Sequence, residues 1–329
     1  MTHTTSSSSP AGTIPDSPAN RPAPKITLPG CAKRTRRGFS KTPADRLIDV
    51  VLALIVVAIV LAVIYPVWFI VIASFSDPTL VSTGKVTLLP RGITFAGYAH
   101  ILADSRIWTG YRNTLIYSFV GTAVNLVVTL PAAFAMSRRE FRPRRIIMFF
   151  FAFTMFFSGG LIPSYLLMRQ LGLLNSMWVF ILPGAFSVFN MIIARSFFEN
   201  SIPEELRDAS QVDGLSYFGF FFRIVLPLSG AIIAVIGLYY FVGHWNDYFT
   251  GLIYIHNQEL QPLQNVLQMI LLANQTQAGA ASMSALQSQN FADQIKFGVI
   301  IVSTVPLLII YPFLQKYFNK GVMIGAVKG

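Results

Sequence analysis

The sequence predicts an all-α protein embedded in a membrane, and two observations lead to this fold class. The 329-residue chain is 53% hydrophobic and only 12% charged, with a mean hydropathy of +0.57, which is too apolar for an ordinary soluble domain. It also contains long apolar segments that reach the roughly 20 residues a helix needs to cross a bilayer. A segment in lipid must pair its own backbone polar groups, so these segments are predicted to be helices.

Six spans are predicted along the chain, at about 47–74, 111–136, 146–168, 178–199, 228–253 and 295–318. The preceding residues, 1–44, are rich in Ser, Pro and basic side chains and are predicted to form a disordered tail. Within the spans, glycines and prolines are interpreted as packing and kink sites rather than binding sites: Gly159, Gly160, Pro163, Pro183 and Pro306.

Two connections between spans, 75–110 and 254–294, are long for a membrane protein. The second contains apolar residues at helical spacing, namely Leu263, Val266, Leu267, Ile270 and Leu271. This connection is either a loop that contacts an external partner or an interfacial helix with a polar flank.

The distribution of charge predicts the orientation. Most of the 25 lysines and arginines fall on the side that holds both termini, which is predicted to be cytoplasmic because basic loops stay inside. This asymmetry explains the net charge of +11, and the basic loops are expected to contact anionic membrane lipid. No nucleic-acid partner is predicted.

Motifs for catalysis are absent from the sequence. It has no phosphate-binding loop, no HExxH, no GxSxG and no Cys/His cluster, and its four histidines are scattered. We therefore expect no catalytic residue, no metal and no cofactor. If the protein drives transport, the energy must come from another chain.

An acidic segment between the fourth and fifth spans, EELRDASQVDG at 204–214, is predicted to be a short cytoplasmic helix. Ser201 and Glu204 have the spacing of a capping box, Pro203 suits the first turn, and Gly214 is a typical helix end. One face, with small residues that allow close approach to a partner, is predicted for Leu206, Ala209 and Ser210. From physical reasoning alone, the helix is either a docking element or a solvated connector.

The same segment carries a family resemblance. Asp208-Ala209-Ser210, three residues, Gly214, nine residues, Ile224, one residue and Leu226-Pro227 resemble the EAA signature, EAAxxxGx9IxLP, of permease subunits of binding-protein-dependent ABC importers. Asp replaces Glu, and Ser replaces the second Ala. Further likeness to sugar permeases of the maltose-transporter type, in the complex-oligosaccharide subgroup, comes from Ile202-Pro203-Glu204-Glu205, Trp245-Asn246-Asp247 and the ending Gly325-Ala326-Val327-Lys328-Gly329.

The resemblance covers about residues 45–329 and implies a type I ABC importer permease fold with six transmembrane helices and a coupling loop at 200–227. It implies that the short helix couples the spans to a cytoplasmic ABC ATPase dimer through Glu204, Glu205, Asp208, Ala209, Ser210 and Gly214. It also implies a second homologous permease subunit, an extracytoplasmic solute-binding protein and a carbohydrate substrate, moved by alternating access across the inner membrane. Alternatives are a permease for a non-sugar solute and a polytopic membrane enzyme or scaffold.

Polar residues in the spans are candidates for the substrate pathway. They are Asn113, Asn125, Asn190, Trp245, Asn246 and Asp247. The alternative is structural: asparagines also bridge helices, and tryptophan is common at the membrane interface.

Overall fold

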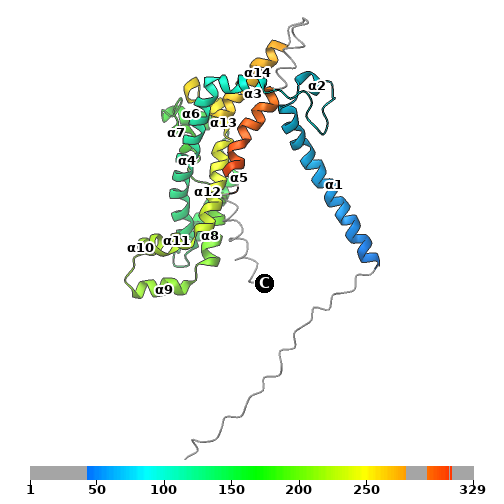
Figure 1. The fold of residues 1–329 in the computed structure, drawn as a ribbon. Helices are drawn as coiled ribbons and strands as arrows, with labels where there is room; N and C mark the ends of the chain where they lie inside the picture. The colour runs from blue at the N-terminus through cyan, green and yellow to red at the C-terminus, as the bar shows by residue number, and fades with distance from the viewer. Residues whose placement is uncertain (1–42, 279–294, 311, 313–329) are drawn as a thin grey trace, which may run out of the picture. The chain divides into compact units, whose positions relative to one another are not determined.

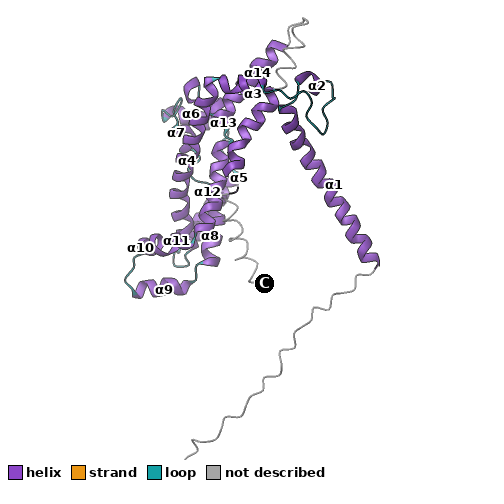
Figure 2. Cartoon of the chain, viewed as in Figure 1, coloured by secondary structure: helices purple, strands orange, loops and turns teal. Residues whose placement is uncertain are grey.

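The structure is a computed structural model that describes residues 43–278, 295–310 and 312 (Figure 1). The chain divides into two units, Met1–Ile59 and Val60–Gly329. The predicted disordered tail lies almost entirely outside the described residues, and so does the C-terminal segment 321–329. All regular structure in the described ranges is helical, as Figure 2 shows.

Two described helices are each long and apolar enough to cross a membrane alone: α1 (Pro43–Ser74) from Arg46 onward, and α4 (Ser105–Ser137). The count rises to as many as four if each of two bent helix pairs is one span. In the first unit, the described side chains of α1 from Arg46 to Ile59 are exposed, as expected of a helix whose partner is lipid or another subunit. The total of six spans stays a prediction.

Three of the predicted spans are broken rather than continuous. Segment 146–168 divides into α5 (Arg144–Phe156) and α6 (Leu161–Gln170), which are bent by 111°. The bend falls at Gly160, whose φ of 83° lies in the left-handed region that glycine tolerates. Segment 178–199 divides into α7 (Trp178–Ile181) and α8 (Val188–Ser201), with Pro183 in the break.

The third broken span is the predicted 228–253 helix. It consists of α12 (Gly230–Trp245) and α13 (Tyr248–Tyr254). The Asp247 carboxylate accepts a hydrogen bond from the backbone N–H of Thr250 at 3.1 Å and caps the start of α13. A side chain that caps a new helix competes with continuation of the old one, which accounts for the break.

The long connections are partly helical. Residues 75–104 contain α2 (Pro78–Ser82) and α3 (Ala96–Ala103), and the connection after α13 contains a 3-10 turn, η3 (Gln258–Leu260), and α14 (Leu263–Ala278). The helical spacing predicted for α14 is confirmed, and Leu263, Val266, Leu267 and Ile270 are buried. An apolar helix, Ile295–Ile310, follows in the described part of the last predicted span.

Helix α4 is the centre of the second unit, where it packs against α7, α8, α12 and α14. A stripe of small and polar residues on α4 is buried in these contacts: Thr114, Ser118, Gly121, Asn125 and Thr129. Small residues let helix backbones approach closely, and polar ones bond across the interface. Toward one end of α4, aromatic and aliphatic residues of α8, α10 and α12 complete a hydrophobic core.

The acidic segment forms α9 (Glu204–Val212), and Gly214 follows it with a φ of 75°. The predicted end is therefore confirmed, but the predicted start is wrong. Ser201 is the last residue of α8, and Pro203 occupies the N-cap position without a side-chain hydrogen bond. Ser201 cannot cap α9 because it still belongs to α8, which ends only two residues before α9 begins.

After α9 the chain forms α10 (Tyr217–Phe220), a π-helical turn η2 (Phe221–Val225) and α11 (Leu226–Leu228). This aromatic segment is bent by 83° from α12. Both α9 and α10 lie at one end of α4, and α3, α7 and α14 lie near the other end (Figure 1).

Candidate functional site

Helix α9 has two differently exposed sides. Arg207 and Ser210 are buried, so Ser210 does not share the outward face predicted for it with Leu206 and Ala209. The outward side carries Leu206, Ala209 and Val212 at spacings of three residues, and Val212 is 89% exposed. Its acidic neighbours, Glu204, Glu205 and Asp208, are exposed as well. The helix thus offers an apolar strip flanked by carboxylates.

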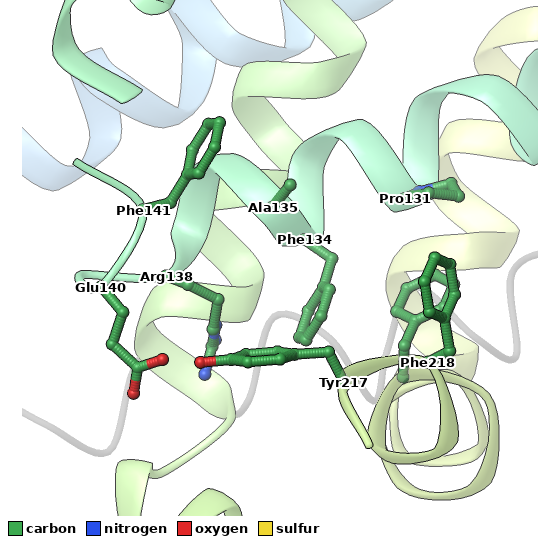
Figure 3. A pocket seen from close by; sticks show the side chains of 9 residues that line it. Pro131, Phe134, Ala135, Arg138, Glu140, Phe141, Tyr217 and Phe218 are labelled. Atoms are coloured by element: carbon green, nitrogen blue, oxygen red, sulfur yellow. The ribbon is translucent and has the colours of Figure 1, made fainter. Parts of the chain in front are cut away.

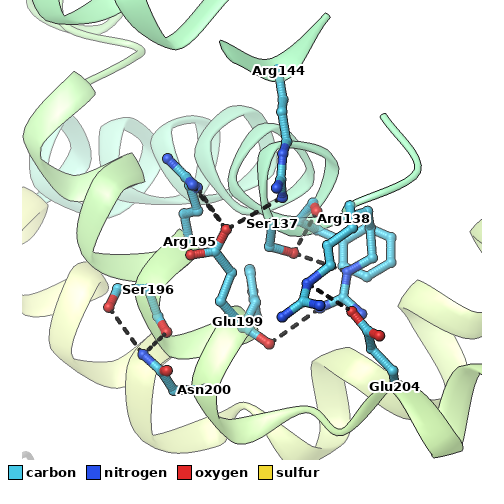
Figure 4. A network of polar contacts seen from close by, with 11 residues as sticks. Ser137, Arg138, Arg144, Arg195, Ser196, Glu199, Asn200 and Glu204 are labelled. Atoms are coloured by element: carbon cyan, nitrogen blue, oxygen red, sulfur yellow. Dashed lines mark hydrogen bonds and ion pairs between the residues drawn. The ribbon is translucent and has the colours of Figure 1, made fainter. Parts of the chain in front are cut away.

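A polar network ties the end of α8, which leads into α9, to the loop between α4 and α5 and to the start of α5 (Figure 4). Glu199 of α8 pairs with Arg195 at 2.9 Å and Arg144 at 3.7 Å, while Arg138 donates to the carbonyl of Phe198 at 3.1 Å. Another pair, Arg139 with Glu204 at 3.3 Å, is largely exposed. Exposed pairs stabilise little individually, so the Arg139–Glu204 pair contributes little to holding α9 in place.

An apolar pocket of about 520 Å³ lies between the end of α4 and α10. Figure 3 shows Tyr217 and Phe218 of α10 on one side and Phe134 and Pro131 of α4 on the other. Beside the pocket, Phe220 of α10 and Phe221 of η2 contact Phe134, with ring centroids 6.1 Å and 5.0 Å from that of Phe134. The chain therefore packs on α4 through the last residue of α10 and the first residue of η2.

A second cavity, of about 310 Å³, lies within the helix bundle and brings together three of the predicted pathway residues, Asn125, Asn190 and Asp247. Its wall combines α4, α8, α12 and the breaks after α7 and α12. The other lining residues are Val179, Phe180, Pro183, Gly184, Ser187, Tyr239, Tyr240, Gly243, His244 and Thr250. Hydroxyl, amide, imidazole and carboxylate groups here could bind a polyhydroxylated solute.

Some of these polar groups already have partners in the protein. Asn125 is 1% exposed; its Nδ2 donates to the carbonyl of Gly184 at 2.6 Å, and its Oδ1 lies 3.1 Å from His244 Nε2. Because Oδ1 can only accept, His244 Nε2 carries the proton in this contact. Asn125 therefore holds the cavity wall together, whereas Asn190 has no side-chain hydrogen bond within the described residues and faces the cavity.

The remaining predicted pathway residues lie elsewhere. Asn113 donates to the carbonyls of Glu259 at 2.7 Å and Gln261 at 3.1 Å, and lines a separate cavity. Trp245 is fully buried in a hydrophobic core and donates to the carbonyl of Ser303 at 3.1 Å. Asn246 is exposed and bonds to its own helix.

Comparison with known proteins settles the family. Residues 107–324, about two thirds of the chain, match the family described as "Binding-protein-dependent transport system inner membrane component". The chain belongs to this permease family. Among its curated relatives are permease subunits, so the chain is a membrane transport subunit rather than an enzyme.

Relatives match nearly their whole length. The polygalacturonan/rhamnogalacturonan transport system permease protein YtcP of Bacillus subtilis (strain 168) is 37% identical over 87% of this chain and 99% of its own. Protein LplC of the same organism is 37% identical over 88% of this chain and 97% of its own. This chain is also similar to a chain of a solved bacterial ABC transporter involved in the import of the acidic polysaccharide alginate. The two match with a TM-score of 0.75 and 31% sequence identity, over 84% of this chain and 98% of the other. The predicted permease fold is confirmed.

The cavity of about 310 Å³ also contains residues that were not predicted from the sequence: Tyr240, His244, Ser187 and Thr250. Tyr240 Oη bonds to Thr129 Oγ1 at 2.6 Å and accepts from the backbone N–H of Ser187 at 3.0 Å. The signal for two of them is present in the sequence, because Tyr240, His244 and Asp247 follow one another at i, i+4 and i+7.

Proposed function

We propose that this chain is a permease subunit of an ATP-driven importer that moves a carbohydrate, most simply an oligosaccharide, by alternating access. YtcP is named for polygalacturonan/rhamnogalacturonan transport, and the solved transporter is involved in the import of alginate. The cavity in the bundle offers hydrogen-bonding groups beside aromatic rings, a combination suited to sugars. An extracytoplasmic binding protein delivers the solute, and a second homologous permease completes the pore.

Helix α9 is the proposed coupling helix, which docks on the cytoplasmic ATPase dimer. The observation that carries this role is the exposed apolar strip of Leu206, Ala209 and Val212. Exposed apolar side chains on an otherwise acidic, well-anchored helix are typical of a docking surface. Glu204, Glu205 and Asp208 flank the strip, Ser210 lies on the buried side of the helix, and Gly214 sets its exit. The end of the bundle that carries α9, together with both chain termini, is then cytoplasmic.

The proposed solute path passes through the cavity of about 310 Å³. Asn190 and Asp247 retain polar atoms for a solute, and Tyr239 adds a ring that is nearly half exposed. Asn125 shapes the wall. Asn113 lines the separate cavity described above, where it positions the 259–261 segment. Trp245 and Asn246 support α12 from outside the cavity.

The coupling role is tested by a matched pair of glycine substitutions. An added Cβ meets nothing within 4 Å at either Gly214 or Gly230, but only Gly214 has a positive φ, of 75°. Gly214→Ala therefore strains the exit of α9 by about 1–2 kcal/mol, and Gly214→Pro cannot adopt this φ at all. Gly230→Ala carries no such strain.

The assay is ATP hydrolysis by the purified complex, stimulated by the sugar-loaded binding protein. Both Gly214 variants are expected to lose stimulation or assembly, and Gly230→Ala to retain both. If Gly214→Pro assembles and is stimulated as the wild type is, α9 is not the coupling helix. Uptake of labelled amino acids or peptides in place of sugars would leave the coupling role intact and overturn the carbohydrate assignment.

A further inference from the structure

Arg207 is an unusual member of α9, because it is a cation with only 6% of its surface exposed. Within the described residues it has no ion pair, its Nε has no hydrogen-bond acceptor, and its Nη1 reaches only the Ser210 hydroxyl at 3.4 Å. Burying an arginine without a carboxylate is costly. Some other interaction must favour this position.

That interaction is aromatic. The guanidinium carbon of Arg207 lies 4.0 Å from the ring centroid of Tyr217 and 5.7 Å from that of Phe220, both in α10. A guanidinium over an aromatic face is attracted by the ring electrons, and most strongly where water is excluded. Arg207 thus joins α9 to α10 across the turn at Gly214 and adds a side-chain contact to the backbone hydrogen bonds of that turn.

Beyond α10, the contacts continue into the core of the bundle. Phe220 is fully buried, and its ring centroid lies 6.1 Å from that of Phe134 in α4. The same core includes Ile236 and Tyr240 of α12, and Tyr240 lines the cavity within the bundle. A continuous packed path therefore leads from Arg207 to the proposed solute path.

We propose that the Arg207–Tyr217 stack is the joint that transmits movement of α9 to α10 and the membrane helices. Arg207 is a positioning residue: it faces inward, away from the outward strip of α9, and makes the α9–α10 pair move as one body. This role rests on the proposed coupling function of α9. Without the stack, displacement of α9 is absorbed at the Gly214 turn.

The experiment uses the whole importer, reconstituted with its ATPase and binding protein. Arg207→Met and Tyr217→Leu each remove one half of the stack, whereas Tyr217→Phe keeps the ring and loses a hydroxyl that has no hydrogen bond within the described residues. Arg223→Met is the matched control for loss of a cation, because Arg223 is exposed in the neighbouring η2. The readouts are the amount of ATPase that co-purifies and the ratio of stimulated to unstimulated hydrolysis.

We expect Arg207→Met and Tyr217→Leu to co-purify with normal amounts of ATPase, and each to lower the stimulation ratio about tenfold. The double variant should be no worse than the more impaired single variant, because both remove the same contact. Tyr217→Phe and Arg223→Met should couple normally. A structural role alone would lower assembly or yield and leave the ratio in the assembled complex unchanged.

Normal stimulation in assembled Arg207→Met, or additive losses in the double variant, would overturn the proposal. If Arg207→Met does not assemble, the comparison of Tyr217→Leu with Tyr217→Phe decides, and equal coupling in these two refutes the stack. A wild-type complex that no carbohydrate-loaded binding protein stimulates would instead refute the proposed function.

Discussion

Gly121 of α4 faces His244 of α12, and replacing it with alanine should disrupt the wall of the cavity. A Cβ at this position would lie 2.4 Å from His244 Nε2, 2.7 Å from Cε1 and 2.8 Å from Cδ2. The imidazole ring would have to retreat by about 1 Å to reach an ordinary contact distance. The 3.1 Å contact between His244 Nε2 and Asn125 Oδ1 would then exceed hydrogen-bond length.

The expected loss combines two costs. Overpacking a well-filled interface costs about 1–3 kcal/mol, and leaving a buried acceptor without its donor costs about 1–3 kcal/mol. The gain in helix propensity from glycine to alanine offsets up to about 1 kcal/mol. The net loss, about 1–6 kcal/mol, should lower the thermal midpoint in detergent by several degrees.

The matched control is Gly237→Ala on the same α4–α12 interface. A Cβ at Gly237 would meet Leu126 at 3.6 Å and Thr122 at 3.9 Å, which are ordinary contacts. This variant should be as stable as the wild type or slightly more stable. Combining Gly121→Ala with His244→Ala removes the clash, so the two losses should not add. An unchanged midpoint for Gly121→Ala, or strict additivity, would refute the reasoning.

Three further predictions concern the end of the bundle remote from α9. Thr114→Val removes the hydroxyl that accepts the first backbone N–H of α14 at 2.8 Å, and should destabilise by about 1–3 kcal/mol, seen as a lower thermal midpoint. Asn175 has a φ of 53° and accepts the backbone N–H groups of 256–257; Asn175→Ala should speed proteolysis there more than Asn175→Gly, which avoids the strain. Hydrogen bonding from Thr79 lowers the pKa of the Asp77 carboxyl. The stabilising effect of the ionised carboxylate on α2 should therefore be lost as the pH falls below about 4. Hydrogen exchange in α2 should become faster over this range, and Asp77→Ala should abolish this dependence on pH.

Several features of the fold could be predicted from particular residues. The spacing from Asp208 to Pro227 indicates the family, and Gly214 ends α9 with the positive φ that its glycine predicts. The apolar residues of α14 are buried as their helical spacing predicts. These predictions succeed because each depends on local backbone chemistry or on a face of one helix.

The failures have an equally local cause in some cases and a tertiary one in others. Hydropathy averages over about 20 residues, so it predicts one continuous span over 146–168, although Gly160 is correctly predicted to be a kink site and the 111° bend falls there. The Ser201–Glu204 spacing fits a helix start, but α8 occupies Ser201 first. Trp245 is a core residue because it packs in a hydrophobic core with residues of other segments, such as Ile107 and Ile295, and it donates to the carbonyl of Ser303. No single-segment pattern contains that information.

The break after α7 is best explained by the cavity that it borders. Backbone groups freed by a break at membrane depth must find partners, and such breaks persist only where protein or a water-filled cavity receives them. Here the Gly184 carbonyl accepts from Asn125, and the Ser187 N–H donates to Tyr240. Both partners come from helices that line the same cavity. The polar residues of α4 and α12 therefore have two roles, since they stabilise the interrupted helix and, by keeping it interrupted, hold the cavity open.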